Sequence, residues 1–225
     1  MHRVIVPDIF PHSVTAFFTA KDPGSNIDDI SSMTGICRTH IYLPVQKHTD
    51  RVLVLNALRE PSIADAVVTN ERGILIGVQA ADCVPLLLYD PGKKVAAAIH
   101  AGWRGTASSI VRKTIDVMMN RFSCEPGDIM VAIGPSIRGC CYAVGPDVIE
   151  AIAHANGNGS YCMIRQGRSC IDLAIANRDQ ALCMNIPESN IWVSRDCTFC
   201  NPERYFSYRY AKGSTGRQAA FIAVR

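Results

Sequence analysis

The sequence predicts an α+β fold, a single domain of mixed but largely antiparallel β-sheets with flanking helices. Three observations lead to this prediction. Short apolar runs bounded by turn residues outnumber amphipathic helical segments. The predicted strands follow one another at hairpin spacing more often than at the spacing of βαβ units. Residues 1–225 contain no internal repeat and no linker long enough to separate two domains.

The central stretch of the chain gives the clearest strand signal. Val84–Tyr89 and Val95–Ile99 are short apolar runs, and a polar connection containing Pro91-Gly92 lies between them. Cys83 opens the first predicted strand and His100 closes the second. If the strands form a hairpin, the thiol and the imidazole are neighbours at one edge of the sheet. Such a pair indicates a metal site or a Cys–His nucleophile.

The same signals predict the remaining elements. Further strands are expected over Val4–Ile9, Val14–Phe18, Ile41–Val45, Val52–Leu55, Ala64–Thr69, Ile74–Gln79, Ile129–Ile133, Ile191–Ser194 and Gln218–Val224. A helical turn is expected over Asp28–Met33, a helix with the apolar face Val111, Ile115, Met118 and Phe122, a helix from Pro146 to before Gly157, and a helix over Asp172–Met184.

Arg104 lies between two glycines, Gly102 and Gly105, directly before the predicted start of a helix. Thr106 or Ser108 is expected to cap that helix. Backbone N–H groups and the helix dipole favour an anion there, so Arg104 is a candidate anion-binding residue. A plain turn with a solvated arginine is the alternative.

His48 falls where two predicted strands are interrupted, and with Cys83 and His100 it makes a set of two imidazoles and one thiolate. Three protein ligands with a fourth position open are typical of a catalytic zinc site. Two alternatives remain: a core thiol with two unrelated histidines, or a metal-free Cys–His pair of a hydrolase. Asp82 either orients one of these histidines or caps a turn. The histidines expected to be solvated or packed are His2, His12 and His154.

Composition excludes several classes of protein. The net charge of +3 is small and the basic residues are dispersed, which argues against nucleic-acid binding. No apolar run is long enough to span a membrane and the N-terminus lacks a secretory pattern, so a cytoplasmic protein is expected. Six histidines are too few for the three or four copper ions of a multicopper oxidase.

Ten cysteines are expected to be mostly reduced thiols that pack as small hydrophobic side chains. Cys197 and Cys200 have CxxC spacing, but a zinc ribbon needs a second such pair. No second CxxC or HxxxH pair occurs in the sequence, so the interpretation is a structural or incidental pair. The adjacent cysteines Cys140 and Cys141 do not easily bridge each other.

Several segments between residues 46 and 218 form a distinctive set. They are Gln46-Lys47-His48, ADCVPLLLYDP at 81–91, VAAAIHAGWRG at 95–105, IGPSIRGCCYAVGPDV at 133–148, DLAIAN at 172–177 and CTFC…YFSYRYAKGSTGRQ at 197–218. This set resembles the bacterial laccase-domain family, which is known both as polyphenol oxidase and as purine nucleoside phosphorylase.

The resemblance implies one mixed α/β domain and a zinc ion bound by His48, Cys83 and His100, with copper as the alternative metal. It implies phosphorolysis of adenosine, inosine and methylthioadenosine, together with adenosine deamination. Some members are described as copper-dependent phenol oxidases, and others are linked to proofreading of peptidoglycan precursors. The expected partners are therefore purine nucleosides and phosphate, with no nucleic acid or membrane, and the expected assembly is a monomer or homodimer.

The chain departs from the family pattern near its N-terminus. The family usually has Thr-x-Arg-x-Gly-Gly, and here Lys21 replaces the arginine, which keeps the charge but loses the bidentate fork. The predicted function is a purine nucleoside phosphorylase, and the alternatives are a cysteine hydrolase or amidase that edits peptidoglycan precursors and a copper-dependent phenol oxidase. The predicted substrate and phosphate residues are Arg104, Lys21, Gln46, Asp82, Arg209 and Arg217.

Overall fold

The structure is a computed structural model that describes residues 3–224, and it confirms the α+β class with mixed, largely antiparallel sheets. The strands are β1 Val4–Ile5, β2 Val14–Thr19, β3 Ile41–Tyr42, β4 Val52–Val54, β5 Ala66–Thr69, β6 Leu75–Ala80, β7 Val84–Asp90, β8 Val95–Ala101, β9 Met130–Ile133, β10 Cys162–Arg165, β11 Arg168–Ile171, β12 Ile191–Val193 and β13 Gln218–Val224. The helices are α1 Ile27–Thr34, α2 Trp103–Ala107, α3 Ile110–Phe122, α4 Pro146–Asn156 and α5 Leu173–Cys183.

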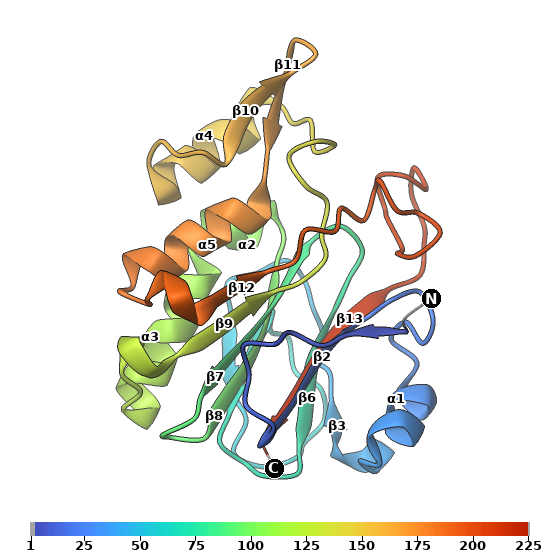
Figure 1. Cartoon of the computed structure of the whole chain (residues 1–225), viewed down its shortest axis with the longest axis vertical. Helices are drawn as coiled ribbons and strands as arrows, with labels where there is room; N and C mark the ends of the chain where they lie inside the picture. The colour runs from blue at the N-terminus through green and yellow to red at the C-terminus, as the bar shows by residue number, and fades with distance from the viewer. Residues whose placement is uncertain (1–2, 225) are drawn as a thin grey trace.

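Two sheets form the centre of the molecule. One has the strand order β1-β2-β13-β6-β3, and the other has the order β12-β9-β7-β8-β5-β4. The neighbours pair antiparallel except β3 with β6, β4 with β5 and β9 with β12. Figure 1 shows α3 and α5 beside the six-stranded sheet and α1 at the opposite side, beside the five-stranded sheet. The chain is thus layered as helices, sheet, sheet and helix.

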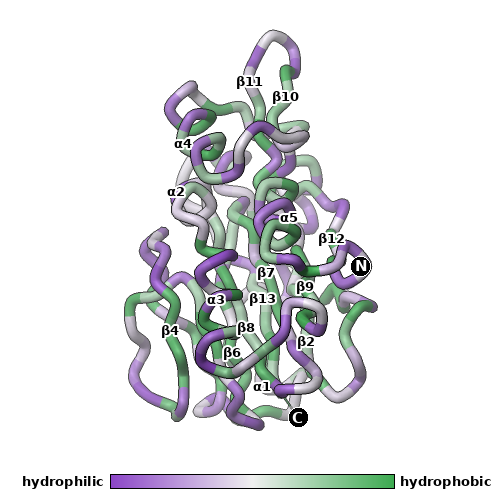
Figure 2. The backbone as a smooth tube through the Cα atoms, turned by 90° about the vertical axis from the view of Figure 1, so that its left-hand side faces the viewer, coloured by the Kyte–Doolittle hydropathy of each residue, from purple (hydrophilic) through white to green (hydrophobic). Residues whose placement is uncertain are grey.

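Strand β7 explains this layering because both of its faces are buried. Leu86 and Leu88 join the core cluster that includes the apolar faces of α3 and α5. Leu87 and Tyr89 point the other way, into the core between the two sheets. In Figure 2 the central strands are mostly green, consistent with residues buried on both faces. Burying each of these leucines contributes about 1.5–3 kcal/mol to stability.

The predicted elements mostly occur, with shifted ends. The first and third predicted strands are much shorter than expected, since β1 ends at Ile5 and β3 ends at Tyr42. The β10–β11 hairpin was not predicted, because its side chains are largely exposed and lack an apolar alternation. Its signal is the two-residue turn Gln166-Gly167, where both φ angles are positive, at 49° and 71°. In Figure 1 this hairpin and α4 lie at the top, beyond the ends of both sheets.

The cysteines do not pack as predicted. All ten are free thiols, but only Cys124, Cys170 and Cys197 are buried. The others lie at the surface or half-buried, so most of them are not core side chains. Within residues 3–224, no helix has the length and apolar character needed to cross a membrane.

Candidate functional site

The β7–β8 hairpin brings Cys83 and His100 together, as the sequence predicts. Val84 pairs with Ala101 and Pro85 pairs with His100 in an antiparallel ladder. Cys83 immediately precedes β7, so it lies beside the end of β8 that carries His100. The hairpin is central in its sheet, which gives both side chains a rigid support.

His48 reaches the same point from the loop between β3 and β4. Its Nε2 lies 3.9 Å from Cys83 Sγ, and its ring centroid lies 4.9 Å from that of His100. One ligand atom from each of the three residues falls within 4.8 Å of the others. We call His48, Cys83 and His100 the histidine–cysteine cluster. The predicted ligand set is therefore assembled in space, from three separate segments of the chain.

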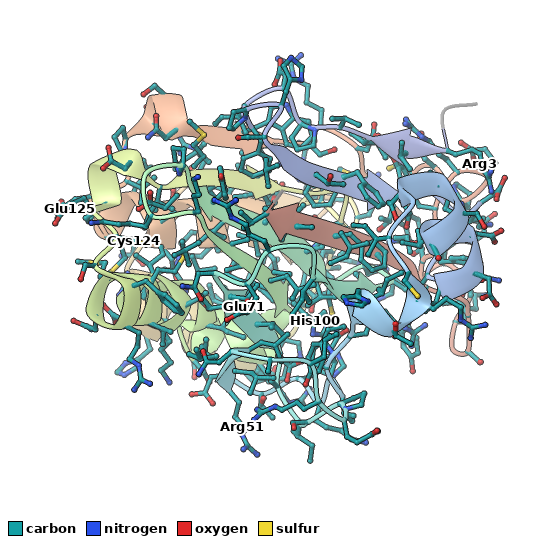
Figure 3. The ribbon with its side chains drawn as sticks, turned by 90° about the horizontal axis from the view of Figure 1, so that it is seen from below. Arg3, Arg51, Glu71, His100, Cys124 and Glu125 are labelled. Carbon is teal, nitrogen blue, oxygen red and sulfur yellow. The ribbon has the colours of Figure 1, made fainter. Side chains whose placement is uncertain are left out.

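The three side chains differ in burial. His100 is 4% exposed, Cys83 is half-buried and His48 is exposed. In Figure 3 His100 lies inside the outline of the molecule, whereas Arg51 and Glu125 project at its edge. The cluster thus has a buried side toward the sheet and an open side toward solvent, which a substrate can approach.

Asp65 holds the cluster in place from beneath. Its fully buried carboxylate lies 2.9 Å from Nδ1 of His100 and accepts the backbone N–H of His48 at 3.1 Å. It also accepts the backbone N–H and the hydroxyl of Thr49, at 2.6 and 2.7 Å. Because an ionised carboxylate only accepts, Nδ1 of His100 carries a proton, which leaves Nε2 as the ring atom that can bind a metal once its own proton is displaced.

Charge stabilises the cluster in spite of burial. Burial alone raises the pKa of the Cys83 thiol and lowers the pKa of the His100 imidazole. The attraction between the thiolate and the imidazolium is larger than this effect of burial. The pKa of Cys83 falls to about 6 and the pKa of His100 rises to about 9. Burial likewise raises the pKa of Asp65, but the hydrogen bonds from His100 and Thr49 hold it well below its usual range. Cys83 is therefore a thiolate at neutral pH, the form that binds metals.

The space around the cluster fits a metal ion. A Cβ atom at Gly102 would lie 3.0 Å from Cys83 Sγ and 3.2 Å from Cδ2 of His48, so only glycine leaves this space clear. One thiolate and two imidazoles are a donor set that suits zinc or copper and leaves one tetrahedral position open. Among the described residues His12, His40 and His154 belong to no group of metal-ligand type, and His2 lies outside them. The donors therefore fit one ion here rather than a multicopper cluster.

The cluster lies in a cavity of about 740 Å³. Five of the six predicted substrate and phosphate residues line it, namely Gln46, Asp82, Arg104, Arg209 and Arg217. Lys21 does not line it. Its ammonium donates to the carbonyl oxygen of Pro202 and lies 5.4 Å from the centroid of the Phe206 ring.

Arg104 occupies a different position in its helix from the one predicted. The helix α2 begins at Trp103 with Gly102 as its N-cap, so Arg104 lies within its first turn. Thr106 does not cap a helix, since its hydroxyl donates to the carbonyl of Gly102 at 3.0 Å. The next helix, α3, begins after Ser109, whose φ is 58°. With five residues, α2 is too short for a strong dipole, so its attraction for an anion rests on the Arg104 guanidinium, 4.3 Å from the Trp103 ring.

Gln46 and Asp82 shape the wall of the cavity. The side-chain amide of Gln46 pairs with the backbone of Gln79, at 2.8 and 2.7 Å. The carboxylate of Asp82 accepts from the Thr198 hydroxyl at 2.6 Å and from the backbone N–H of Arg209 at 2.7 Å. Asp82 was a candidate to orient a histidine, but Asp65 is the carboxylate that does so.

The sequence interpretation missed several residues of this site. Asp65 carried a signal, because it is a charged residue inside a predicted apolar strand. Trp103, Tyr142 and Tyr208 line the cavity with aromatic rings, and the guanidinium of Arg209 lies 5.1 Å from the Tyr142 ring. Burial, and then the nearby Cys83 thiolate, raises the pKa of Tyr142 to about 12, so its hydroxyl stays protonated.

Comparison with known proteins shows which family the chain belongs to. Residues 21–225 match the family described as multi-copper polyphenol oxidoreductase laccase. Purine nucleoside phosphorylase YlmD from Geobacillus stearothermophilus is 39% identical over 164 residues, which span 72% of this chain and only 60% of that relative. Adenosine deaminase RL5 from an unknown prokaryotic organism is 34% identical over 201 residues, 84% of this chain and 76% of that relative.

A solved structure shares the fold. The crystal structure of YlmD from Geobacillus stearothermophilus superposes with a TM-score of 0.89 at 28% identity, and the match covers 97% of this chain and 94% of that one. The family model spans the segments that carry all three residues of the histidine–cysteine cluster and the arginines of the cavity. The chain therefore belongs to the multi-copper polyphenol oxidoreductase laccase family.

Proposed function

We propose that this chain is a purine nucleoside phosphorylase that acts on adenosine, inosine and methylthioadenosine. The observation that carries the proposal is the composition of one cavity. It combines the histidine–cysteine cluster, three arginine side chains and three aromatic rings. The relatives described as a purine nucleoside phosphorylase and as an adenosine deaminase support the same substrate class.

Phosphate binds to the arginines in this proposal. Arg104, Arg209 and Arg217 line the cavity and are exposed to solvent. Among the described residues, the guanidinium of Arg104 contacts the Trp103 ring but forms no hydrogen bond or ion pair, so its donors are available. Guanidinium groups bind phosphate oxygens in pairs of parallel hydrogen bonds, which fixes orientation as well as affinity. Lys21 has no part in this step because it lies outside the cavity.

The nucleoside binds against the aromatic wall. Trp103, Tyr142 and Tyr208 offer apolar ring surfaces on which a purine stacks. The Tyr142 hydroxyl remains a hydrogen-bond donor at neutral pH, since its pKa is raised to about 12. Stacking of the base orients the ribose toward the arginines.

In the reaction a phosphate oxygen forms a bond to the anomeric carbon of the ribose, and the bond from that carbon to the purine nitrogen breaks. The bonding electrons leave with the purine, which takes up the proton that the phosphate loses. The products are the free base and ribose 1-phosphate, or 5-methylthioribose 1-phosphate from methylthioadenosine, and no further reactant is required. Positive charge develops on the ribose in the transition state. The arginines hold the phosphate anion, whose negative charge stabilises this positive charge.

The histidine–cysteine cluster binds zinc in this proposal. His48, Cys83 and His100 would hold the ion, and the ion would supply a Lewis acid to the cavity. Asp65 binds Nδ1 of His100 and so leaves Nε2 as the atom that would bind the ion, and the Cys83 thiolate needs no base to ionise at neutral pH. We assign adenosine deamination to the same cavity: water replaces the amino group of the purine and ammonia leaves.

A second candidate function is a cysteine hydrolase or amidase that acts on peptidoglycan precursors. The observation that favours it is the thiolate–imidazolium pair of Cys83 and His100, with Asp65 behind the histidine. Metal content separates the two functions. A hydrolase of this type stays active after zinc is removed by a chelator, whereas the proposed phosphorylase becomes inactive.

The test is incubation of the purified protein with inosine, with and without inorganic phosphate. Ribose 1-phosphate and hypoxanthine are expected only when phosphate is present. Release of hypoxanthine at the same rate without phosphate would identify a nucleoside hydrolase instead. If no base is released from inosine, adenosine or methylthioadenosine, the proposal is wrong.

A further inference from the structure

A second cluster of ligand type lies outside the histidine–cysteine cluster. Its members are Cys140 and Cys141 from the loop after β9, and Cys197 and Cys200 from the loop after β12. One sulfur atom from each lies within 4.8 Å of the other three. We call these residues the four-cysteine cluster. Figure 1 shows the two loops running side by side between the sheets and the β10–β11 hairpin.

The four sulfur atoms lie close enough together to bind one metal ion. Cys141 Sγ lies 3.3 Å from Cys200 Sγ, and Cys140 Sγ lies 3.8 Å from the same atom. Zinc–sulfur bonds of about 2.3 Å place the sulfurs of a tetrahedral site about 3.8 Å apart. A disulfide needs about 2.0 Å between sulfurs, and all four residues are free thiols. The spacing therefore allows four ligands around one ion and is longer than a disulfide bond.

The backbone fixes the cysteines in this arrangement. The carbonyl oxygen of Cys197 accepts from the backbone N–H and the side-chain amide of Asn201, at 3.2 and 2.8 Å. This turn brings the two thiols of the CxxC segment to one side. Across the gap, Cys197 pairs with Ser136 in a β-bridge, and the backbone N–H of Arg138 donates to Cys197 Sγ at 3.4 Å. The bridge and this hydrogen bond hold Cys197 against the loop that carries Cys140 and Cys141.

The four cysteines differ in burial, which suits a structural site that a metal ion can enter. Cys197 is 5% exposed and Cys141 is half-buried, so the cluster has a solid inner side. Cys140 and Cys200 are exposed, which leaves a path for an ion. The cluster thus has the donors, the spacing and the access that a metal needs.

We propose that Cys140, Cys141, Cys197 and Cys200 bind one zinc ion in a closed, structural site. The proposal is independent of the phosphorylase activity, because it uses none of the residues of the histidine–cysteine cluster. The ion ties the loop after β9 to the loop after β12. Tyr142 directly follows one ligand and lines the cavity, and Thr198 lies between two ligands and donates to Asp82. The ion therefore steadies two walls of the active site.

The first test is the zinc content of full-length protein purified under reducing conditions and freed of loose metal. Wild-type protein is expected to hold about two zinc ions per chain. The double variant Cys141→Ser/Cys200→Ser is expected to hold about one, and so is His48→Ala/His100→Ala. The matched control is Cys183→Ser, which removes an exposed thiol outside both clusters and should leave about two. Equal zinc in wild type and Cys141→Ser/Cys200→Ser overturns the proposal.

The second test does not depend on the folding of a cysteine variant. In His48→Ala/His100→Ala protein, added Co²⁺ is expected to give the intense visible bands of tetrahedral cobalt and sulfur-to-cobalt charge transfer. Weak octahedral bands alone contradict a four-thiolate site. Counting thiols in unfolded wild-type protein distinguishes oxidation from metal binding: all ten cysteines titrate if the cluster is a zinc site, and two fewer titrate if it forms a disulfide. The disulfide result also overturns the proposal.

Discussion

The two ligand clusters of this chain differ in the kind of structure that holds their residues in place. His48, Cys83 and His100 are attached to a buried hairpin and to one loop pinned by a buried carboxylate. The four cysteines are attached to two long loops outside the sheets, held together by one β-bridge and a few hydrogen bonds. The first cluster is preformed by the core of the fold. The second is held by loop contacts, and the proposed zinc ion adds a further link between its two loops.

The two clusters also differ in the number of ligands that they offer to a metal ion. The histidine–cysteine cluster offers three donors and faces a cavity of about 740 Å³, so a metal bound there keeps a position for substrate or water. The four-cysteine cluster offers four thiols, which fill a tetrahedral shell and leave no position for chemistry. One cluster therefore suits catalysis and the other suits structural support. Substitutions in the two clusters should differ in kind as well as in size.

Loss of a ligand in the open cluster should have the largest effect. Replacing Cys83 with Ala removes the thiolate donor, and we expect kcat/KM for inosine to fall by roughly 10³-fold or more, since a metal supplies several kcal/mol to a transition state. About one zinc ion per chain should be lost as well. Steady-state phosphorolysis and metal analysis measure both. Cys183→Ala is the control and should keep wild-type activity. Full activity of Cys83→Ala would exclude this residue from the reaction.

Removing the support beneath the open cluster should have the next largest effect. Asp65→Asn removes the negative charge of the carboxylate that contacts Nδ1 of His100. The zinc affinity of that cluster should therefore fall about 10–100-fold. Competition with a chromophoric chelator measures the affinity. Asp50→Asn is the control, because it removes a carboxylate from the loop that carries His48, where it pairs with Lys113. If both variants bind zinc equally well, Asp65 is not a positioning residue.

The phosphate side of the cavity should show a separate, moderate effect. Arg104→Gln removes a charged hydrogen-bond donor. A hydrogen bond from such a donor to phosphate contributes about 1.5–3 kcal/mol, so the KM for phosphate should rise about 10–100-fold. The KM for inosine should change much less, since the base binds to the aromatic wall. Lys21→Gln is the control, as this lysine lies outside the cavity. A larger effect of Lys21→Gln than of Arg104→Gln would contradict the proposed phosphate site.

The open cluster was predictable because its ligands are tied to regular structure. Apolar runs and a turn predicted the β7–β8 hairpin, and antiparallel geometry then placed Cys83 beside His100. His48 followed from its position at a strand interruption and from the family resemblance. Asp65 was missed, because a hydrogen bond between residues 65 and 100 depends on the pairing of β5 with β8.

The four-cysteine cluster was not predictable for a physical reason. Sequence spacing shows one CxxC pair, and a zinc ribbon normally supplies a second. Here the adjacent residues Cys140 and Cys141 take the place of that second pair, about sixty residues away along two loops without periodic patterns. The parallel pairing of β9 with β12 brings the two loops together. The start of helix α2 at Trp103 was also missed, because Gly102 and Gly105 favoured a turn at this point.

The smallest effect on activity should come from the hydrogen bond that links the two clusters. Thr198 is fully buried between two of the cysteines, and its hydroxyl donates to Asp82, the neighbour of Cys83, at 2.6 Å. Thr198→Val leaves a buried carboxylate oxygen without this donor, so the free energy of unfolding should fall by about 1.5–3 kcal/mol in urea denaturation. Thr39→Val, at an exposed position, should change it by less than about 0.5 kcal/mol. Zinc content should stay at the wild-type level and kcat/KM should fall only a few-fold, because every ligand remains. A loss of activity as large as that of Cys83→Ala would mean that the two clusters act as one catalytic unit, and the division between an open and a closed site would be wrong.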